Sequence, residues 1–170
     1  FAFLPHARGH MKRDMSIKNS PPVTIVVEGQ RDAQVLRGLL DDSQLKGTRF
    51  FAAQGNLSIG SLARNILVHE GSSVVVAVDA DGAPGKVESE QSSALGSVAP
   101  TERYSVVVFE PSLDDIMASV GLGPNEVISD EKKHLLRAHP QVDNFLKRLA
   151  HFQPSCEPDP QPSVVQSGAC

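Results

Sequence analysis

The sequence predicts a single α/β domain, built on a central parallel sheet of about four strands with helices on both faces. Short runs rich in valine and isoleucine alternate along the chain with segments of helical period. The runs are apolar throughout, which is typical of strands that are buried on both faces of a sheet. The helices between such strands provide the crossovers that a parallel sheet needs, so we expect a Rossmann-like arrangement.

The composition allows one domain of ordinary size. The chain has 170 residues, of which 40% are hydrophobic and 5% aromatic, so the core must be made mainly of aliphatic side chains. A net charge of −4 does not provide the basic field that dominates non-specific nucleic-acid binding. Cys156 and Cys170 have neither zinc-ligand spacing nor the density of a disulfide scaffold, which favours a cytoplasmic location. No apolar run approaches the ~20 residues of a membrane span, so we expect no membrane partner.

The elements are expected to follow one another within residues 21–152. Strands with their turns are predicted at 23–29, 48–55, 73–82 and 104–112, and helices at 31–42, 57–71, 113–121 and 131–152, the last interrupted around Pro140. Residues 83–102 are small and polar and predict a loop with a short helix. Residues 1–20 are expected to be a disordered, partly vector-derived leader, and the Pro- and Ser-rich residues 153–170 a flexible tail.

Acidic residues follow three of the four predicted strands. The first strand is followed by Glu28 and Asp32, the third by Asp79 and Asp81, and the fourth by Glu110, Asp114 and Asp115. Because the carboxyl ends of parallel strands lie at one edge of a sheet, we expect these groups to gather there. Asp79 and Asp81 are two apart on what we expect to be extended backbone, and should point to the same side. Clustered carboxylates stay ionised only when a cation or strong hydrogen bonds compensate, and oxygen ligands suit Mg²⁺ or Mn²⁺.

Each of these acids also has a purely structural explanation. Asp32 at the start of a helix is stabilised by the helix dipole alone, and the acids after the fourth strand are ordinary at a helix start. Asp79 and Asp81 are typical of turns, since Asp-Gly is a common turn pair. The turn explanation does not account for acids after the first and fourth strands, so we expect Glu28, Asp79 and Asp81 to form a functional set.

Two segments, VTIVVEGQRDAQVL and the later VVVAVDADG, resemble the Toprim domain shared by topoisomerases, DnaG-type primases, RecR-type repair proteins and the OLD (overcoming lysogenization defect) nucleases. The family signature is a Glu after a hydrophobic first strand and an Asp-x-Asp after a later one, each here followed by glycine. The likeness is closest to the OLD type, in which an acid matches Asp32 and a later strand ends in an acidic motif like FEPSLDD. The resemblance covers residues 23–118.

The resemblance implies a metal-dependent nuclease that hydrolyses phosphodiester bonds in DNA. It implies one or two ions of Mg²⁺ or Mn²⁺, held by Glu28, Asp32, Asp79, Asp81 and Asp114, with Glu28, Asp79 and Asp81 as catalytic residues. The candidate substrate contacts are Gly29, Arg31, Gly82 and Lys86, with Lys132 and Lys133 as alternatives, although each of these lysines is more often a solvated charge.

Several features of the family are missing. OLD proteins usually join this domain to an ABC-type ATPase, and no Gly-x-x-x-x-Gly-Lys-Ser/Thr loop occurs here. The single tyrosine, Tyr104, lies at the start of a predicted core strand, which argues against topoisomerase chemistry. We therefore expect an excised domain, a small stand-alone protein or one subunit of a larger complex, with an ATPase or other protein acting in trans.

Two alternatives to the nuclease remain open. One is a non-catalytic Toprim module that binds a protein or nucleic-acid partner in repair, replication or phage defence. The other is a different doubly wound domain, such as a phosphotransfer receiver or a small hydrolase. Receivers, however, carry paired acids after the first strand and a phosphorylated Asp and a Lys after later ones. This sequence does not reproduce that order.

Overall fold

The computed structural model describes residues 22–54 and 56–153, and it has the α/β architecture that the sequence predicts. Four strands form one all-parallel sheet in the order β2-β1-β3-β4. Their bounds are Val23–Val27 for β1, Thr48–Ala52 for β2, Val74–Asp79 for β3 and Tyr104–Phe109 for β4. The fold is therefore Rossmann-like, with β1 and β3 in the middle of the sheet.

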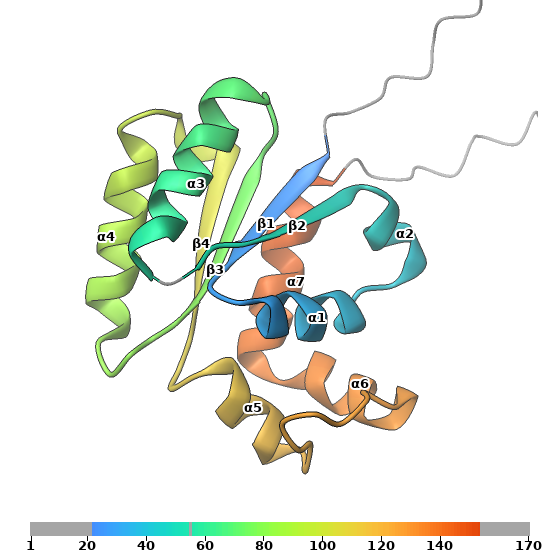
Figure 1. Ribbon diagram of the computed structural model, residues 1–170. Coiled ribbons are helices and arrows are strands. Elements are labelled where there is room, and N and C mark those ends of the chain that lie inside the picture. The colour runs from blue at the N-terminus through green and yellow to red at the C-terminus, as the bar shows by residue number, and fades with distance from the viewer. Residues whose placement is uncertain (1–21, 55, 154–170) are drawn as a thin grey trace, which may run out of the picture.

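Helices cover both faces of the sheet (Figure 1). One face is covered by α1 (Gln30–Leu39), α2 (Asp42–Lys46) and α7 (Pro140–Phe152), and the other by α3 (Asn56–His69) and α4 (Pro84–Gly96). The helices α5 (Leu113–Ser119) and α6 (Asp130–Ala138) extend the first core beyond the carboxyl ends of the strands (Figure 1). A single 3-10 turn, Thr101–Arg103, precedes β4 among the described residues. Because each face has its own helices, side chains from both sides of a strand can be buried.

The two central strands show why their sequences are almost entirely apolar. All five residues of β1 and the first five of β3 are buried. Ile25 faces the core beneath α1 and α7, while the next residue, Val26, faces the core beneath α3 and α4. Side chains alternate between the faces of a sheet, so a strand covered on both sides needs apolar residues throughout.

The structure differs from the predictions at two helices. Residues 83–102, predicted as a loop with a short helix, contain the 13-residue helix α4, which begins with Pro84 in its first turn. The predicted helix 31–42 ends at Leu39, and α2 follows as a separate helix. Its start is fixed where the backbone N–H of Asp41 donates to Oε1 of Gln44 at 3.0 Å. The predicted break around Pro140 is confirmed by the junction of α6 and α7.

The predicted leader at 1–20 and residues 154–170 of the predicted tail lie outside the described residues. Gln153 is described, and its Nε2 donates to the carbonyl of Gln44 at 2.9 Å and to Oγ1 of Thr48 at 3.0 Å. The chain is therefore still fixed to the domain at the first residue of the predicted tail. Within the described residues, no helix is both long enough and apolar enough to span a membrane.

Candidate metal centre

The acids after the first and third strands are brought together by the strand order. Because β1 pairs directly with β3, Glu28 and Asp79 stand at the carboxyl ends of neighbouring strands. Asp32 lies in the first turn of α1, which follows Glu28. Asp114 lies in the first turn of α5, which follows β4. In Figure 1 the start of α1 and the whole of α5 lie at this end of the sheet.

Glu28 is the most perturbed of the acids. Its Oε1 atom is buried and accepts no hydrogen bond within the described part of the chain. Burial is the main cause that raises the pKa of Glu28, from 4.5 to about 7, and the negative charges of Asp79, Asp81 and Asp32 raise it further. A backbone hydrogen bond from Asp79 opposes these effects. A carboxyl group in this state is poised to exchange a proton near neutral pH or to accept a cation.

Asp79 and Asp32 are also perturbed, but each has a hydrogen-bond donor. Oδ1 of Asp79 accepts from the backbone N–H of Leu113 at 2.8 Å, which ties the end of β3 to the start of α5. Oδ2 of Asp32 accepts from the backbone N–H of Gly29 at 3.0 Å. Burial raises the pKa of both groups above the usual range, while these hydrogen bonds lower it. The two carboxylates are therefore partly compensated by the fold itself.

The expectation of extended backbone from Asp79 to Asp81 is wrong. Strand β3 ends at Asp79, and Asp81 has a left-handed backbone with φ of 48°, followed by Gly82 at 76°. The chain therefore turns sharply before Asp81, so the simple alternation of a strand does not apply. The charge of Asp81 nevertheless raises the pKa of both Glu28 and Asp79, so Asp81 belongs to the same cluster by a different backbone path.

Asp114 is held by a cation. Its Oδ1 lies 3.0 Å from NH2 of Arg31, with side chains that are 57% and 39% exposed respectively. Its charge still raises the pKa of Asp32 and Asp79. Asp115 instead exchanges hydrogen bonds with Ser112 at the start of α5. Asp114 thus joins the edge of the cluster, whereas Asp115 has a capping role.

The residues predicted to contact substrate fall into two groups. Gly29, Arg31, Gly82 and Lys86 lie beside the acids. Lys132 and Lys133 do not, because they donate to the backbone carbonyls of Val120 and Leu40 respectively, at the ends of α5 and α1. The two lysines therefore hold helix ends rather than substrate. Glu110 is an exposed residue, and its backbone pairs with the amide of Gln141.

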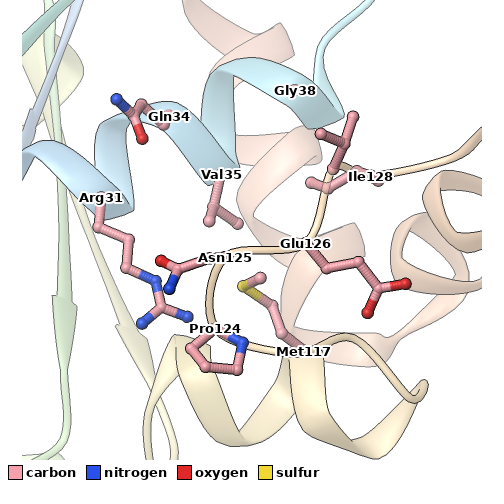
Figure 2. Close-up of a pocket in the computed structure, with 10 residues that line it drawn as sticks. Arg31, Gln34, Val35, Gly38, Met117, Pro124, Asn125, Glu126 and Ile128 are labelled. Atoms are coloured by element: carbon pink, nitrogen blue, oxygen red, sulfur yellow. The ribbon is translucent and has the colours of Figure 1, made fainter.

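Two cavities flank the acids. One, of about 470 Å³, opens between α1, α5 and the loop at residues 124–128. Figure 2 shows the side chain of Arg31 running along it toward Pro124 and Asn125, with Val35 and Met117 facing each other across it. The other, of about 430 Å³, lies between α3 and α4 and reaches Asp81. We call the second cavity the α3–α4 groove.

The sequence did not point to the α3–α4 groove. Its walls include Arg64 from α3, together with Lys86 and Gln91 from α4. These side chains share a groove only because residues 84–96 form a helix, whereas the sequence predicted mainly a loop there. The basic character of Arg64 was visible, but its position beside the acids was not.

The acids suit a divalent cation by their chemistry but are not gathered around a single point. In the described part of the chain, no three His, Cys, Asp or Glu side chains form a group that could hold a metal ion. The unpartnered oxygen of Glu28 and the hard oxygen donors around it fit Mg²⁺ or Mn²⁺ if the side chains turn inward.

Comparisons of the chain with protein-family models, with curated proteins and with solved structures give no match.

Proposed function

We propose that the acidic edge of the sheet binds one or two Mg²⁺ or Mn²⁺ ions and hydrolyses phosphodiester bonds in DNA, as nucleases of the OLD-type Toprim kind do. The observation that carries this proposal is the buried, unpartnered oxygen of Glu28 among the charges of Asp79 and Asp81. Such an excess of negative charge is costly to the fold and is typical of a site that awaits a cation. The resemblance of the two strand-end motifs to the Toprim signature supports the same chemistry.

The acids have different roles in this proposal. Asp79 and Asp81 would be the principal ligands of the first ion, with Glu28 as a further ligand. Asp32 and Asp114 would bind a second ion. A bound ion would polarise the phosphoryl oxygens and lower the pKa of water. As the proton carrier, Glu28 would take the proton from the attacking water and return it to the leaving oxygen. One water is consumed, and the products are a phosphate monoester and a free hydroxyl.

A cleavage assay tests the proposal directly. We expect the protein to cut plasmid or single-stranded DNA with Mn²⁺, and the double variant Asp79→Asn/Asp81→Asn to lose at least about 100-fold in rate. Asparagine keeps the size of the side chain and an oxygen that can accept from Leu113. The matched control is Asp42→Asn/Asp130→Asn, which removes two exposed acids from the starts of α2 and α6. Undiminished cutting by the first variant, with normal unfolding curves for both, would refute the proposal.

A specific observation favours a second candidate, a non-catalytic module of the same fold that binds a protein or nucleic-acid partner. Asp32 and Asp79 each already accept a backbone hydrogen bond, and the described residues contain no ready group of metal ligands. Structural roles alone would explain both acids. Calorimetric titration with Mn²⁺ separates the two candidates, because a protein that binds no Mn²⁺ and cuts no nucleic acid would be such a module.

A further inference from the structure

We propose that the α3–α4 groove holds the sugar-phosphate backbone of the strand that enters the acidic site, with Arg64 and Lys86 contacting phosphates next to the one that is cut. This inference rests on the proposed function, because it assigns the path of the substrate of that same site. Arg64 is the new element, since neither its sequence context nor any family signature singled it out.

The shape of the α3–α4 groove suits a polymer backbone. Asp81 is one of its lining residues, so a strand lying in the groove would pass beside this acid. Small residues line much of the rest, including Gly60, Ser61, Ala83 and Ala94. A Cβ atom at Gly60 would meet Oε1 of Gln91 at 3.4 Å and Cβ of Ala94 at 3.8 Å, so the two helices approach closely at the floor.

Two cations in the groove, Arg64 and Lys86, are available for phosphate, although the carboxylates of Asp81 and Glu90 also line it. Arg64 is exposed, and none of the described residues forms a hydrogen bond or ion pair with it. Nζ of Lys86 lies 3.8 Å from Oε1 of Glu90, and both side chains are mostly exposed. An exposed pair at that distance contributes little, so Lys86 can turn to a phosphate at small cost. An unpaired guanidinium with its fork of donors is well suited to a phosphate oxygen pair.

A third polar group lies at the floor of the groove. Oε1 of Gln91 is buried there without a hydrogen-bond partner in the described part of the chain. Half a turn of the amide would place its NH₂ group at the same position. An atom at that position is buried, so the donors that can reach a phosphate in the groove are those of Arg64 and Lys86.

The other cavity is less suited to the phosphate backbone. Its cation, Arg31, is already paired with Asp114, and its lining includes the apolar side chains of Val35, Met117 and Ile128 (Figure 2). Of the two cavities that flank the acids, the α3–α4 groove is therefore the one with cations available for phosphate.

Binding measured without cleavage tests this path. The probe is fluorescein-labelled oligothymidylate in Ca²⁺, and the dissociation constant is followed by anisotropy over a range of KCl concentrations. We expect Arg64→Gln/Lys86→Gln to bind about 10-fold more weakly near physiological salt. The slope of log affinity against log salt should fall by about 1.4, because each single-strand phosphate contact contributes about 0.7. Arg64→Lys/Lys86→Arg keeps both charges and should retain the slope of the wild type.

The matched control is Arg37→Gln/Lys46→Gln, which removes one exposed arginine and one exposed lysine from α1 and α2 on the opposite face of the sheet. It should bind with the affinity and slope of the wild type. A wild-type slope for Arg64→Gln/Lys86→Gln, or equal losses in the control, would overturn the inference, as would a wild type that binds no oligonucleotide. If the wild type still cuts DNA and Asp79→Asn/Asp81→Asn does not, those results overturn this path alone and leave the proposed function standing.

Discussion

At the amino ends of the strands, Arg49 is surrounded by acceptors, whereas at the carboxyl ends Glu28 keeps a buried oxygen without a partner. NH2 of Arg49 donates to Oγ1 of Thr24 at 3.3 Å, to Oγ of Ser72 at 2.9 Å and to Oε2 of Glu70 at 2.5 Å. Thr24 and Ser72 are buried, so Arg49 satisfies polar groups inside the fold. Only its Nε, among the guanidinium nitrogens, is buried without a partner.

The carboxyl ends show the opposite balance. Five carboxylates lie there, and Arg31 is the cation seen to pair with one of them. Folded proteins pair nearly all of their buried polar groups, and exceptions concentrate where a ligand completes the set. The charged groups at the two ends of the strands therefore have different effects on the fold. Charges at the amino end stabilise the sheet, whereas those at the carboxyl end are kept at a cost in stability.

The largest expected loss of stability comes from removing the guanidinium group of Arg49 at the amino ends of the strands. Arg49→Met should lower the free energy of unfolding by about 2–3 kcal/mol, because it leaves the buried hydroxyl groups of Thr24 and Ser72 and the carboxylate of Glu70 without this donor. Urea unfolding at pH 7 measures the change. Arg64→Met is the control, since Arg64 is exposed and unpaired among the described residues, and it should change stability by less than about 0.5 kcal/mol. Equal losses in both variants would contradict the role assigned to the amino end.

Removing the charge of Glu28 should raise the free energy of unfolding rather than lower it. The pKa of Glu28 is about 7 in the folded protein, whereas a glutamate outside the fold has a pKa of 4.5. Between these two pH values the folded state therefore binds more protons than the unfolded chain. The stability that this difference provides is complete below pH 4.5 and is lost as pH rises through 7. Without metal, Glu28→Gln should match the wild type near pH 4.5. At pH 8 it should exceed the wild type by about 1–2 kcal/mol after solvent screening.

Unfolding in urea with EDTA, repeated from pH 4.5 to 8, tests this expectation. Glu102→Gln is the control, because Glu102 is exposed in the turn before β4, and its effect should not change over this range. A gain at Glu28 that is the same at every pH would show that packing, rather than charge, limits the site. Burial also raises the pKa of Asp32 and Asp79, so some fall in stability with pH should remain in the variant.

The strands and their order of appearance were predictable because burial on both faces leaves a strong pattern in the sequence. The helix α4 was not predictable to the same extent, since Leu95 is its single fully buried residue in the described chain and its remaining sequence is small and polar. Such a helix is stabilised by packing against α3 and β4 rather than by its own pattern. The separate α2 buries no residue completely and left no signal either.

The same contrast applies to the candidate site. Glu28 and Asp79 were predictable because a residue directly after a buried strand has little choice of position. Asp81 was predicted as part of the cluster, but through extended backbone, because the left-handed turn at Asp81 and Gly82 is not encoded by alternation. The pairing of Arg31 with Asp114 and the position of Arg64 depend on how separate helices pack, which a single sequence does not reveal.

Binding of a metal ion should offset part of the stability cost of the carboxylates at the carboxyl ends of the strands. At ten times its dissociation constant, Mn²⁺ should raise the free energy of unfolding by about 1.4 kcal/mol, and by less at pH 5, where the carboxyl groups are more protonated. Arg49→Met should respond as the wild type does, because Arg49 lies at the opposite end of the strands from the acids. Thermal unfolding with and without Mn²⁺, at equal ionic strength, measures the effect. An equal response from Asp79→Asn/Asp81→Asn would place the ion elsewhere.

The smallest expected change in stability is at Asp32. It decides whether this acid only stabilises the start of α1 or also binds a metal ion. Its Oδ2 accepts from the backbone N–H of Gly29, and an asparagine oxygen can accept the same bond. Removing the charge relieves the cost of burial but loses the favourable interaction with the start of α1. These terms oppose one another, so Asp32→Asn should change metal-free stability by less than about 0.5 kcal/mol. Asp32→Ala loses the acceptor and should cost about 1 kcal/mol.

Affinity for Mn²⁺ then separates the two explanations of Asp32. If Asp32 only holds the start of α1, the stable Asp32→Asn variant binds Mn²⁺ as the wild type does. If Asp32 is a ligand of a second ion, calorimetry should show affinity lowered by at least about 10-fold while the unfolding curve stays unchanged. We expect the second result, because burial and the charge of Asp114 raise the pKa of Asp32 despite its hydrogen bond from Gly29 and the neighbouring charge of Arg31. An acid that only stabilises a helix start should have a lowered pKa, because its negative charge is favoured there. The pKa of Asp32 is raised instead.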